Sequence, residues 1–336
     1  MKARSPLRYV IATLLVLVVI SVFHRKPSIS GTSFTGSHVR VLICAGKDFP
    51  RLSSGYVYDL VRRFSSDARF TAEIAFVRDS SWVDSLRAGV ADLVAIDGTH
   101  HPDDSLQLAV SVPLPGHYVL AVPASDIARM QEINRYLHRE QTAKGYQARI
   151  QRYLRPYSPS RPDQGTYLGP YDEIFKQEAQ KIGWDWRLLA SVAYKESRFH
   201  IEGQSRKGAV GLMQLLPGTA ARFGAADPID PQQSVAAAAT YLSYIEKLLV
   251  RRHEDLRLEH ALVLASYNAG EGQILRCLQT LDSLHVSTSV WENVIQTIPS
   301  VEGFKGKETV AYVKEVLDLY EDIKRFLPSL QDRPGQ

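Results

Sequence analysis

A glutamate on an otherwise apolar helix face is the first residue whose type and position suggest chemistry. Leu188, Val192 and Glu196 are spaced four residues apart in a segment with helical periodicity, so they share one face. Burial on such a face disfavours the charged form of a carboxylate and raises its pKa, as a general acid near neutral pH requires. The spacing alone leaves open a glutamate that pairs with a buried Arg or Lys, or one at the exposed edge of the face.

Two short motifs follow that could form the surroundings of this glutamate. The sequence GAVGLMQ at 208–214 holds two glycines, which let backbone approach backbone or a ligand closely, and Gln214, whose amide both donates and accepts hydrogen bonds. Tyr267-Asn268-Ala269-Gly270 ends a helical segment with a flat ring and a second amide. Each motif alone is also typical of an ordinary turn or helix end, so neither one indicates a site by itself.

Together, these segments resemble the SLT-domain lytic transglycosylases, whose fold is similar to that of goose-type lysozyme. The resemblance depends on Glu196-Ser197, on the pattern S-x-x-G-A-x-G-L-M-Q-x-x-P from Ser205 to Pro217, and on the Y-N-A-G helix end at 267–270. The segment ETVAYVKEVL at 308–317 resembles the closing helix of that family. The match keeps order and spacing over about residues 169–327.

The resemblance implies a role for each matching residue. Glu196 would be the only catalytic acid and base, and Ser205 would hydrogen-bond the N-acetyl group of the substrate. The other candidate substrate-binding residues that the resemblance implies are Ser197, Gly211, Met213, Gln214, Tyr267, Asn268, Glu308 and Tyr312.

The implied reaction is cleavage of the MurNAc–GlcNAc β-1,4 bond of peptidoglycan, with formation of 1,6-anhydro-MurNAc ends. An ordinary glycosidase needs two carboxylates, and the motifs supply one, which suffices when the substrate's own hydroxyl replaces water as the nucleophile. No cofactor and no metal are expected. The only His pair, His100-His101, has no partner four residues away on a helix and no Cys nearby. The alternatives are a hydrolytic muramidase and a periplasmic sensor or glycan-binding protein without cleavage.

Helical periodicity and capping residues predict an all-α domain over 169–330. Asp185 is the expected N-cap of a helix from Trp186 to Phe199, and Asp230 with Pro231 is expected to open a long helix. The other expected helices are 171–182, ending at Gly183, then 217–224, 256–267, 271–281, 289–298 and 307–326.

The preceding part of the chain alternates strand and helix patterns, which predicts an α/β domain over 38–155. The expected strands are 39–45, 70–77, the end of 80–96, and 117–124, and the expected helices are 56–67, the start of 80–96, and 127–154. The segments HVRVLI, SLRAGVADLVAI and SVPLPGHYVLAV resemble lobe one of the family-3 periplasmic solute-binding proteins. The second lobe has no counterpart, so this single-lobe, solute-binding-like domain is read either as a regulatory or partner-docking unit or as a spacer. A Pro- and Gly-rich linker over 156–168 separates the two domains, and the expected fold class is α+β multidomain.

The N-terminus predicts export to the periplasm. Residues 9–23 form an uncharged apolar run between basic clusters, and no small-x-small cleavage site follows, which favours an uncleaved signal anchor over 1–26 and a tether over 27–37. The expected location is the periplasm, with the inner membrane favoured over the outer membrane. The expected partners are glycan strands and, through the N-terminal segment, the membrane.

The charge distribution argues against a nucleic-acid partner. The formal net charge is +4, and five positive charges lie in the first thirty residues, so removing those five leaves −1 for the rest of the chain. A basic surface for nucleic acid is therefore not expected. Cys44 and Cys277 are too few for a disulfide scaffold or a four-cysteine zinc site.

Overall fold

The structure is a computed structural model, and it describes residues 33–45, 53–78, 80–98, 107–158, 167–252, 260–288, 291–298, 301, 304 and 306–327. The expected signal anchor, most of the tether, most of the linker and the pair His100-His101 lie outside these residues. The chain divides into two compact units, 1–154 and 155–336.

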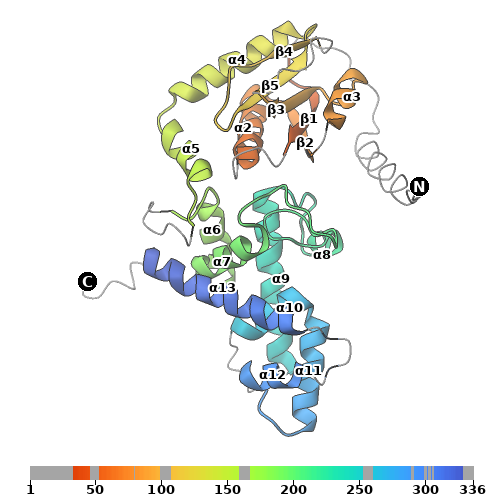
Figure 1. Cartoon of the computed structure of the whole chain (residues 1–336), viewed down its shortest axis with the longest axis vertical. Helices are drawn as coiled ribbons and strands as arrows, with labels where there is room; N and C mark the ends of the chain where they lie inside the picture. Colours follow the sequence, from red (N-terminus) through yellow and green to blue (C-terminus); the bar gives the residue numbers. More distant parts are fainter. Residues whose placement is uncertain are drawn as a thin grey trace, which may run out of the picture. The chain divides into compact units, whose positions relative to one another are not determined.

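The first unit is a mixed five-stranded sheet with helices on both faces (Figure 1). The strand order is β2-β1-β3-β5-β4, in which β1 pairs in parallel with β2 and β3, whereas β5 is antiparallel to both β3 and β4. The strands are β1 (His38–Cys44), β2 (Thr71–Val77), β3 (Leu93–Asp97), β4 (Leu108–Val110) and β5 (Tyr118–Pro123). The helices are α2 (Ser53–Ala68), α3 (Ser81–Arg87), α4 (Ile127–Thr142) and α5 (Tyr146–Leu154).

Alternation along the strands explains the two covered faces. Leu42, Val94 and Ala121 pack with Leu86 of α3 on one face, and the residues between them face the side that α2 and α4 cover. A buried ion pair ties β1 to the loop before β3, because Arg40 Nε donates to Asp92 Oδ2 at 2.9 Å. The expected strand–helix alternation is confirmed, and the α/β sheet is as predicted.

The antiparallel pairing of β4 with β5 was not part of the expectation. Only the short segment from Ser111 to His117 joins the two strands, and a connection of that length returns the chain beside itself in the opposite direction. The alternating pattern predicted β5 but not β4, and the short connection explains why the two strands run antiparallel.

The second unit is helical. Asp185 caps α7 as predicted, since its carboxylate accepts a hydrogen bond from the Arg187 amide at 2.9 Å, and Gly183 ends α6 with a φ of 72°. The small non-helical element consists of isolated bridges at Gln204–Val210 and Val210–Leu215. The helices are α6 (Asp172–Ile182), α7 (Trp186–Ser197), α8 (Pro217–Arg222), α9 (Pro231–Arg252), α10 (His260–Ala269), α11 (Glu271–Ser283), α12 (Trp291–Thr297) and α13 (Gly306–Phe326).

Helix α10 lies at the centre of this unit, in contact with α9, α11 and α13 (Figure 1). Its residues from Ala261 to Ser266 are all buried, as expected for a helix that is apolar all round. Helix α13 packs along α7 and also contacts α10. The end of α7, the end of α10 and the start of α13 are thereby held together, and these three places carry Glu196, Ser197, Tyr267, Asn268, Glu308 and Tyr312.

Candidate active site

Glu196 lies in the last turn of α7, on the face that the sequence predicted. Leu188 and Val192, one and two turns earlier on that face, are 1% and 0% exposed, whereas Glu196 is half-buried. The helix ends directly afterwards, because Arg198 adopts a left-handed conformation with a φ of 52°. The carboxylate therefore sits where an apolar helix face meets a loop.

The Glu196 carboxyl group has one side-chain hydrogen-bond donor among the described residues. The Tyr312 hydroxyl of α13 donates to Glu196 Oε1 at 2.8 Å. Burial raises the pKa of Glu196 to about 7, although the hydrogen bond from Tyr312 and the charge of Lys195 oppose that rise. A carboxyl group with such a pKa can hold a proton and release it near neutral pH, as general acid and base catalysis requires.

Two tyrosines flank this carboxyl group. Tyr312 is buried, and burial together with the charge of Glu196 raises the pKa of both Tyr312 and Tyr267 well above the usual value. Both hydroxyls therefore stay protonated and act as donors. Tyr267 donates to the Met213 carbonyl at 2.8 Å, which joins the end of α10 to the loop before α8.

The segment from Gly203 to Leu216 is a tight loop beside Glu196. Gly211 has a φ of 77°, and a Cβ there would lie 1.9 Å from the Pro228 carbonyl oxygen, so only glycine fits. The Gln214 side chain donates to the carbonyls of Gly203 and Gly211, at 2.9 and 3.0 Å. The close backbone approach that the sequence suggested at the second glycine is confirmed, and its partner is the chain itself.

The structure brings most of the candidate residues to this loop and to the two helix ends. Ser197 Oγ donates to the Leu212 carbonyl at 2.7 Å, which fixes the loop to the end of α7. Ser205 is exposed, and its Oγ accepts from the Ala209 amide at 3.0 Å. Met213 is 0% exposed, and its backbone carbonyl accepts the hydrogen bond from Tyr267.

Asn268 and Glu308 mark the far side of the same region. Asn268 is exposed, and its Oδ1 accepts from the Thr309 hydroxyl at 3.0 Å. Glu308 is exposed in the first turn of α13, directly before Thr309. The start of α13 is therefore joined to the end of α10 through Thr309.

Sequence reasoning missed Thr309 and Tyr241. Tyr241 of α9 lies 5.5 Å from the Tyr267 ring, centroid to centroid, and its hydroxyl donates to Glu271 Oε2 at 2.8 Å. Thr309 follows Glu308 inside the quoted ETVAYV motif, so its position was visible, but its partner was not. No pattern in the sequence indicated Tyr241.

In the described part of the chain, no group of three or more His, Cys, Asp or Glu side chains could hold a metal ion. Among the same residues, no helix has both the length and the apolar composition of a membrane span.

Comparison with known proteins finds a family and relatives that resemble this region. Residues 173–286 match the family described as the transglycosylase SLT domain. The chain is 30% identical over 176 residues to the membrane-bound lytic murein transglycosylase F of Desulfosudis oleivorans, which covers 48% of this chain and 37% of that protein. It is 31% identical over 163 residues to the protein of the same name from Pseudomonas fluorescens, covering 47% of this chain and 33% of the relative. The match thus spans little more than a third of those relatives' length.

Solved structures give a weaker likeness. An inactive variant of the lytic transglycosylase Slt from Pseudomonas aeruginosa has a TM-score of 0.39 and 22% identity, covering 60% of this chain and 35% of that one. The 70 kDa soluble lytic transglycosylase of Escherichia coli also has a TM-score of 0.39, with 20% identity over 63% of this chain and 33% of that one. The family match at residues 173–286 falls within the second unit and includes Glu196.

Proposed function

We propose that this chain is a peptidoglycan lytic transglycosylase. The observation that carries the proposal is Glu196, a half-buried carboxyl group whose pKa is raised to about 7 inside the matched SLT segment. Tyr312 and Lys195 are the neighbours that shift this pKa, and no second carboxylate of the described residues is among them. A mechanism with one carboxyl group that acts first as acid and then as base fits this arrangement.

In the proposed reaction, protonated Glu196 gives its proton to the oxygen of the MurNAc–GlcNAc bond, and the bond between C1 and that oxygen breaks. The acetamido oxygen of the substrate stabilises the oxocarbenium-like centre at C1. The Glu196 carboxylate then takes the proton of the C6 hydroxyl, whose oxygen forms the new bond to C1. The product is a 1,6-anhydro-MurNAc end, and the glutamate returns to its protonated form.

Tyr312 has a defined part in this cycle. Its hydroxyl occupies Glu196 Oε1, which leaves Oε2 as the oxygen that carries the transferable proton. Because the Tyr312 pKa is raised well above the usual value, the donor keeps its own proton throughout. The hydrogen bond thus orients the carboxyl group in both of its protonation states.

Mass analysis of the products released from purified sacculi tests the proposal. We expect anhydro ends, which are lighter by one water than reducing ends, and no release by a Glu196→Gln variant that remains folded. Reducing ends would instead identify a hydrolytic muramidase. Absence of release by the unchanged protein would identify a sensor or glycan-binding protein.

We also propose that residues 1–26 attach the protein to a membrane, facing the periplasm. The uncharged run at 9–23, the basic flanks and the word membrane-bound in the names of the relatives support this location. Cell fractionation with N-terminal sequencing tests it. Recovery in the soluble periplasmic fraction with a trimmed N-terminus would show that the segment is a cleaved signal.

For the first unit we propose a docking or spacing role, without capture of small solutes. Small ligands gain affinity by burying most of their surface in a concave site, and a single lobe offers only one wall. Calorimetric titration of the full chain with free amino acids should show no binding at micromolar concentrations. Micromolar binding would revive a ligand-controlled role for this unit.

A further inference from the structure

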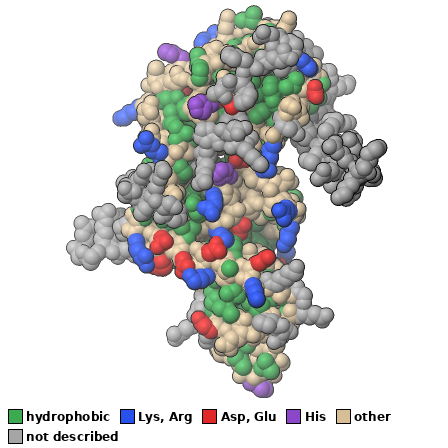
Figure 2. Space-filling model, in the orientation of Figure 1, with side chains coloured by type: hydrophobic (Ala, Val, Ile, Leu, Met, Phe, Trp, Pro, Cys, Tyr) green, Lys and Arg blue, Asp and Glu red, His purple; other side chains and the backbone are tan. Residues whose placement is uncertain are grey.

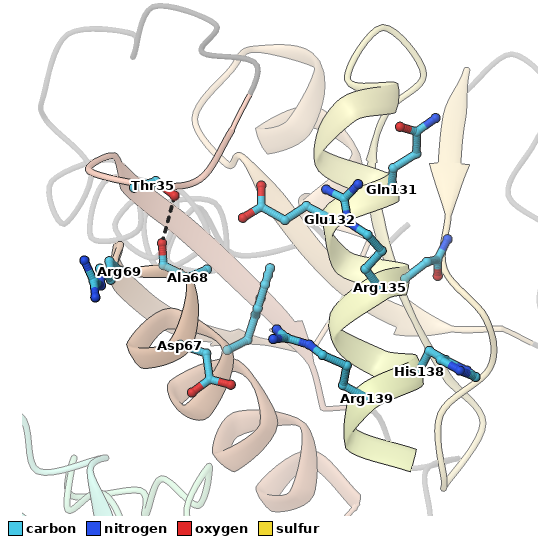
Figure 3. Close-up of a pocket in the computed structure, with 11 residues that line it drawn as sticks. Thr35, Asp67, Ala68, Arg69, Gln131, Glu132, Arg135, His138 and Arg139 are labelled. Carbon is cyan, nitrogen blue, oxygen red and sulfur yellow. Dashed lines mark hydrogen bonds between the residues drawn. The ribbon is translucent and has the colours of Figure 1, made fainter. Parts of the chain in front are cut away.

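A surface groove of about 1150 Å³ crosses the first unit between α4 on one side and the end of α2 with the segment before β1 on the other (Figure 3). Figure 3 shows Arg139 pointing from α4 into this gap, with Arg69 on the opposite rim. The lining residues are Thr35, Phe64, Asp67, Ala68, Arg69, Gln131, Glu132, Asn134, Arg135, His138 and Arg139.

The groove holds positive charge that is not paired with an acid among the described residues, although the Arg139 guanidinium lies over the Tyr136 ring, 5.9 Å from its centroid. The exposed side chains of Arg69, Arg135 and Arg139 make no hydrogen bond or ion pair with another described residue. By contrast, the nearby Arg63 outside the groove is paired with Asp59 and Glu140. Three guanidinium groups therefore face solvent around one groove, each with its donors available.

The acids of the groove offset this charge only in part. Glu132 accepts from the Phe34 amide and from Ser33 Oγ, both at 3.2 Å, so its carboxylate is engaged by the segment before β1. Asp67 is the other acid in the groove. Over 127–154, which spans α4 and α5, the sequence has six Lys and Arg against two Glu. Figure 2 shows blue basic side chains at the margin of the first unit near α4 and α5.

The chemistry of these side chains selects phosphate. Arginine presents planar, forked donors that bind phosphate oxygens in pairs, and the side-chain amides of Gln131 and Asn134 can serve the remaining oxygens. The lining side chains are largely exposed, which suits a surface of many headgroups better than enclosure of one small molecule.

The position of the groove in the sequence supplies the second observation. Ser33, whose hydroxyl contacts Glu132, follows Lys26 by seven residues, and seven extended residues span at most about 25 Å. A bilayer that holds residues 9–23 would therefore lie within that reach of the rim of the groove. Because the connection is so short, the groove would meet that bilayer at a high effective concentration. This strengthens a contact between them without any increase in the affinity of the groove itself.

We propose that this groove docks on the phosphate-bearing headgroups of anionic phospholipids, in the bilayer to which the N-terminal segment attaches the chain. The inference rests on the proposed membrane attachment. Docking holds the first unit against the membrane surface. The groove is then a second, electrostatic contact, in addition to the apolar contact of residues 9–23 with the bilayer.

The test uses the full chain with Gln131→Cys, an exposed position in the groove, because both native cysteines are buried. The protein is reconstituted into phosphatidylcholine vesicles with or without phosphatidylglycerol, and the rate of maleimide labelling is measured. We expect phosphatidylglycerol to slow labelling at least about fivefold, the factor expected for one arginine at an anionic surface. Arg135→Ala with Arg139→Ala should restore the fast rate, whereas Arg87→Ala on the other face of the sheet should not.

Each arm of the experiment has a decisive outcome. Equal labelling rates in both vesicle types, with the chain attached to both, overturn the docking and leave the membrane attachment standing. Failure to sediment with either vesicle overturns both. Slowing by inorganic phosphate alone, or by soluble wall peptides and not by lipid, would assign the groove to another ligand and overturn the proposal. Glycan cleavage in detergent, measured on the same samples, stays unchanged in the arginine variants.

Discussion

Helix α7 carries an acid at each end, and the two acids have opposite surroundings. Asp185 caps the start of the helix, is bound by the buried Arg187 through Nε at 3.0 Å, and accepts from the Tyr320 hydroxyl at 3.0 Å. Glu196, near the end of the helix, has one tyrosine hydroxyl and no direct cationic partner among the described residues. Both acids face α13, which supplies Tyr320 at one end and Tyr312 at the other.

This difference in partners separates the two pKa values. Burial alone would raise the pKa of Asp185, but the hydrogen bonds and charge of Arg187, with the bond from Tyr320, outweigh it and lower that pKa. For Glu196, burial outweighs the hydrogen bond from Tyr312 and the charge of Lys195, and its pKa rises to about 7. One pair of helices thus holds a structural acid that is charged at neutral pH and a second acid that titrates near neutral pH, a division of roles that is common for pairs of acids.

The largest effect is expected from Glu196→Gln. The variant lacks the transferable proton, and general acid catalysis is worth about 10²- to 10⁴-fold, so glycan cleavage should fall by at least that factor. The amide keeps the shape of the side chain and can still accept from Tyr312, so the fold should persist. Product release from sacculi gives the activity, and circular dichroism confirms the fold.

The same variant should gain stability at high pH. The pKa of Glu196 is above its unfolded value, so the folded state binds more protons and wild-type stability falls as pH rises from about 4.5 to about 7. Above that range, the buried charge of Glu196 lowers the free energy of unfolding by up to about 3 kcal/mol. Gln carries no such charge and no such penalty. Urea unfolding should therefore give equal stabilities at pH 4 and a more stable variant at pH 8. A less stable variant at pH 8 would contradict the assigned burial of the charge.

Arg187→Met tests the other end of the helix. Arg187 is 3% exposed and also donates to the Leu327 carbonyl at 2.9 Å, so its loss leaves Asp185 without its cation and the Leu327 carbonyl, just after α13, without this donor. Breaking a buried ion pair from one side costs about 3–5 kcal/mol, and partial exposure of Asp185 places the expected loss at about 3 kcal/mol. Urea unfolding at pH 7 measures it.

A matched control and a pH series sharpen this prediction. Lys176→Met removes the cation of an exposed pair with Glu173 and should cost less than about 1 kcal/mol. Because the Asp185 pKa is lowered, its contribution is present at neutral pH and is lost as pH falls below the usual aspartate value. In Arg187→Met, the free energy of unfolding should no longer show this fall at acid pH. Equal effects of both substitutions would show that Asp185 and Arg187 act as an ordinary surface pair.

Parts of this arrangement could be predicted from sequence because they depend on neighbours along the chain. Capping by Asp185, the helix end at Gly183 and the face shared by Leu188, Val192 and Glu196 each follow from residue type and local spacing. Most elements of both units were predicted in the same way, but β4 was not. Only the family resemblance singled out Tyr312 and Glu308.

The rest depends on contacts between distant segments. Tyr312 and Glu196 are 116 residues apart, and periodicity gives the face of each helix but not the register between two helices. For the same reason, the sequence does not predict the hydrogen bond from Thr309 to Asn268, which is 41 residues away. The fit of Gly211 against the Pro228 carbonyl required the path of another loop, which no residue in the GAVGLMQ motif specifies.

Tyr312→Phe should alter the titration of the active-site acid. The hydroxyl stabilises the charged form of Glu196, so its loss should raise the pKa of that group by about one further unit. Cleavage requires protonated Glu196, so the alkaline limb of the pH–rate profile should move to higher pH by that amount. Loss of orientation should lower the plateau rate about tenfold. An unmoved profile would show that the hydroxyl does not act on Glu196.

The smallest effect is expected from Tyr320→Phe, which makes the same chemical change later in the same helix. Tyr320 donates to Asp185 Oδ2 at 3.0 Å, and that carboxylate keeps its bonds from Arg187, so the loss should cost about 0.5–1.5 kcal/mol of unfolding free energy. Because Asp185 is charged at all pH values at which the enzyme would work, the pH–rate profile of cleavage should stay where it is. Thermal unfolding and cleavage rates from pH 5 to 9, measured beside Tyr312→Phe, separate the two tyrosines. A shift of the profile by Tyr320→Phe would mean that the position of α13 as a whole sets the Glu196 pKa, and the two ends of the helix pair would then act as one unit.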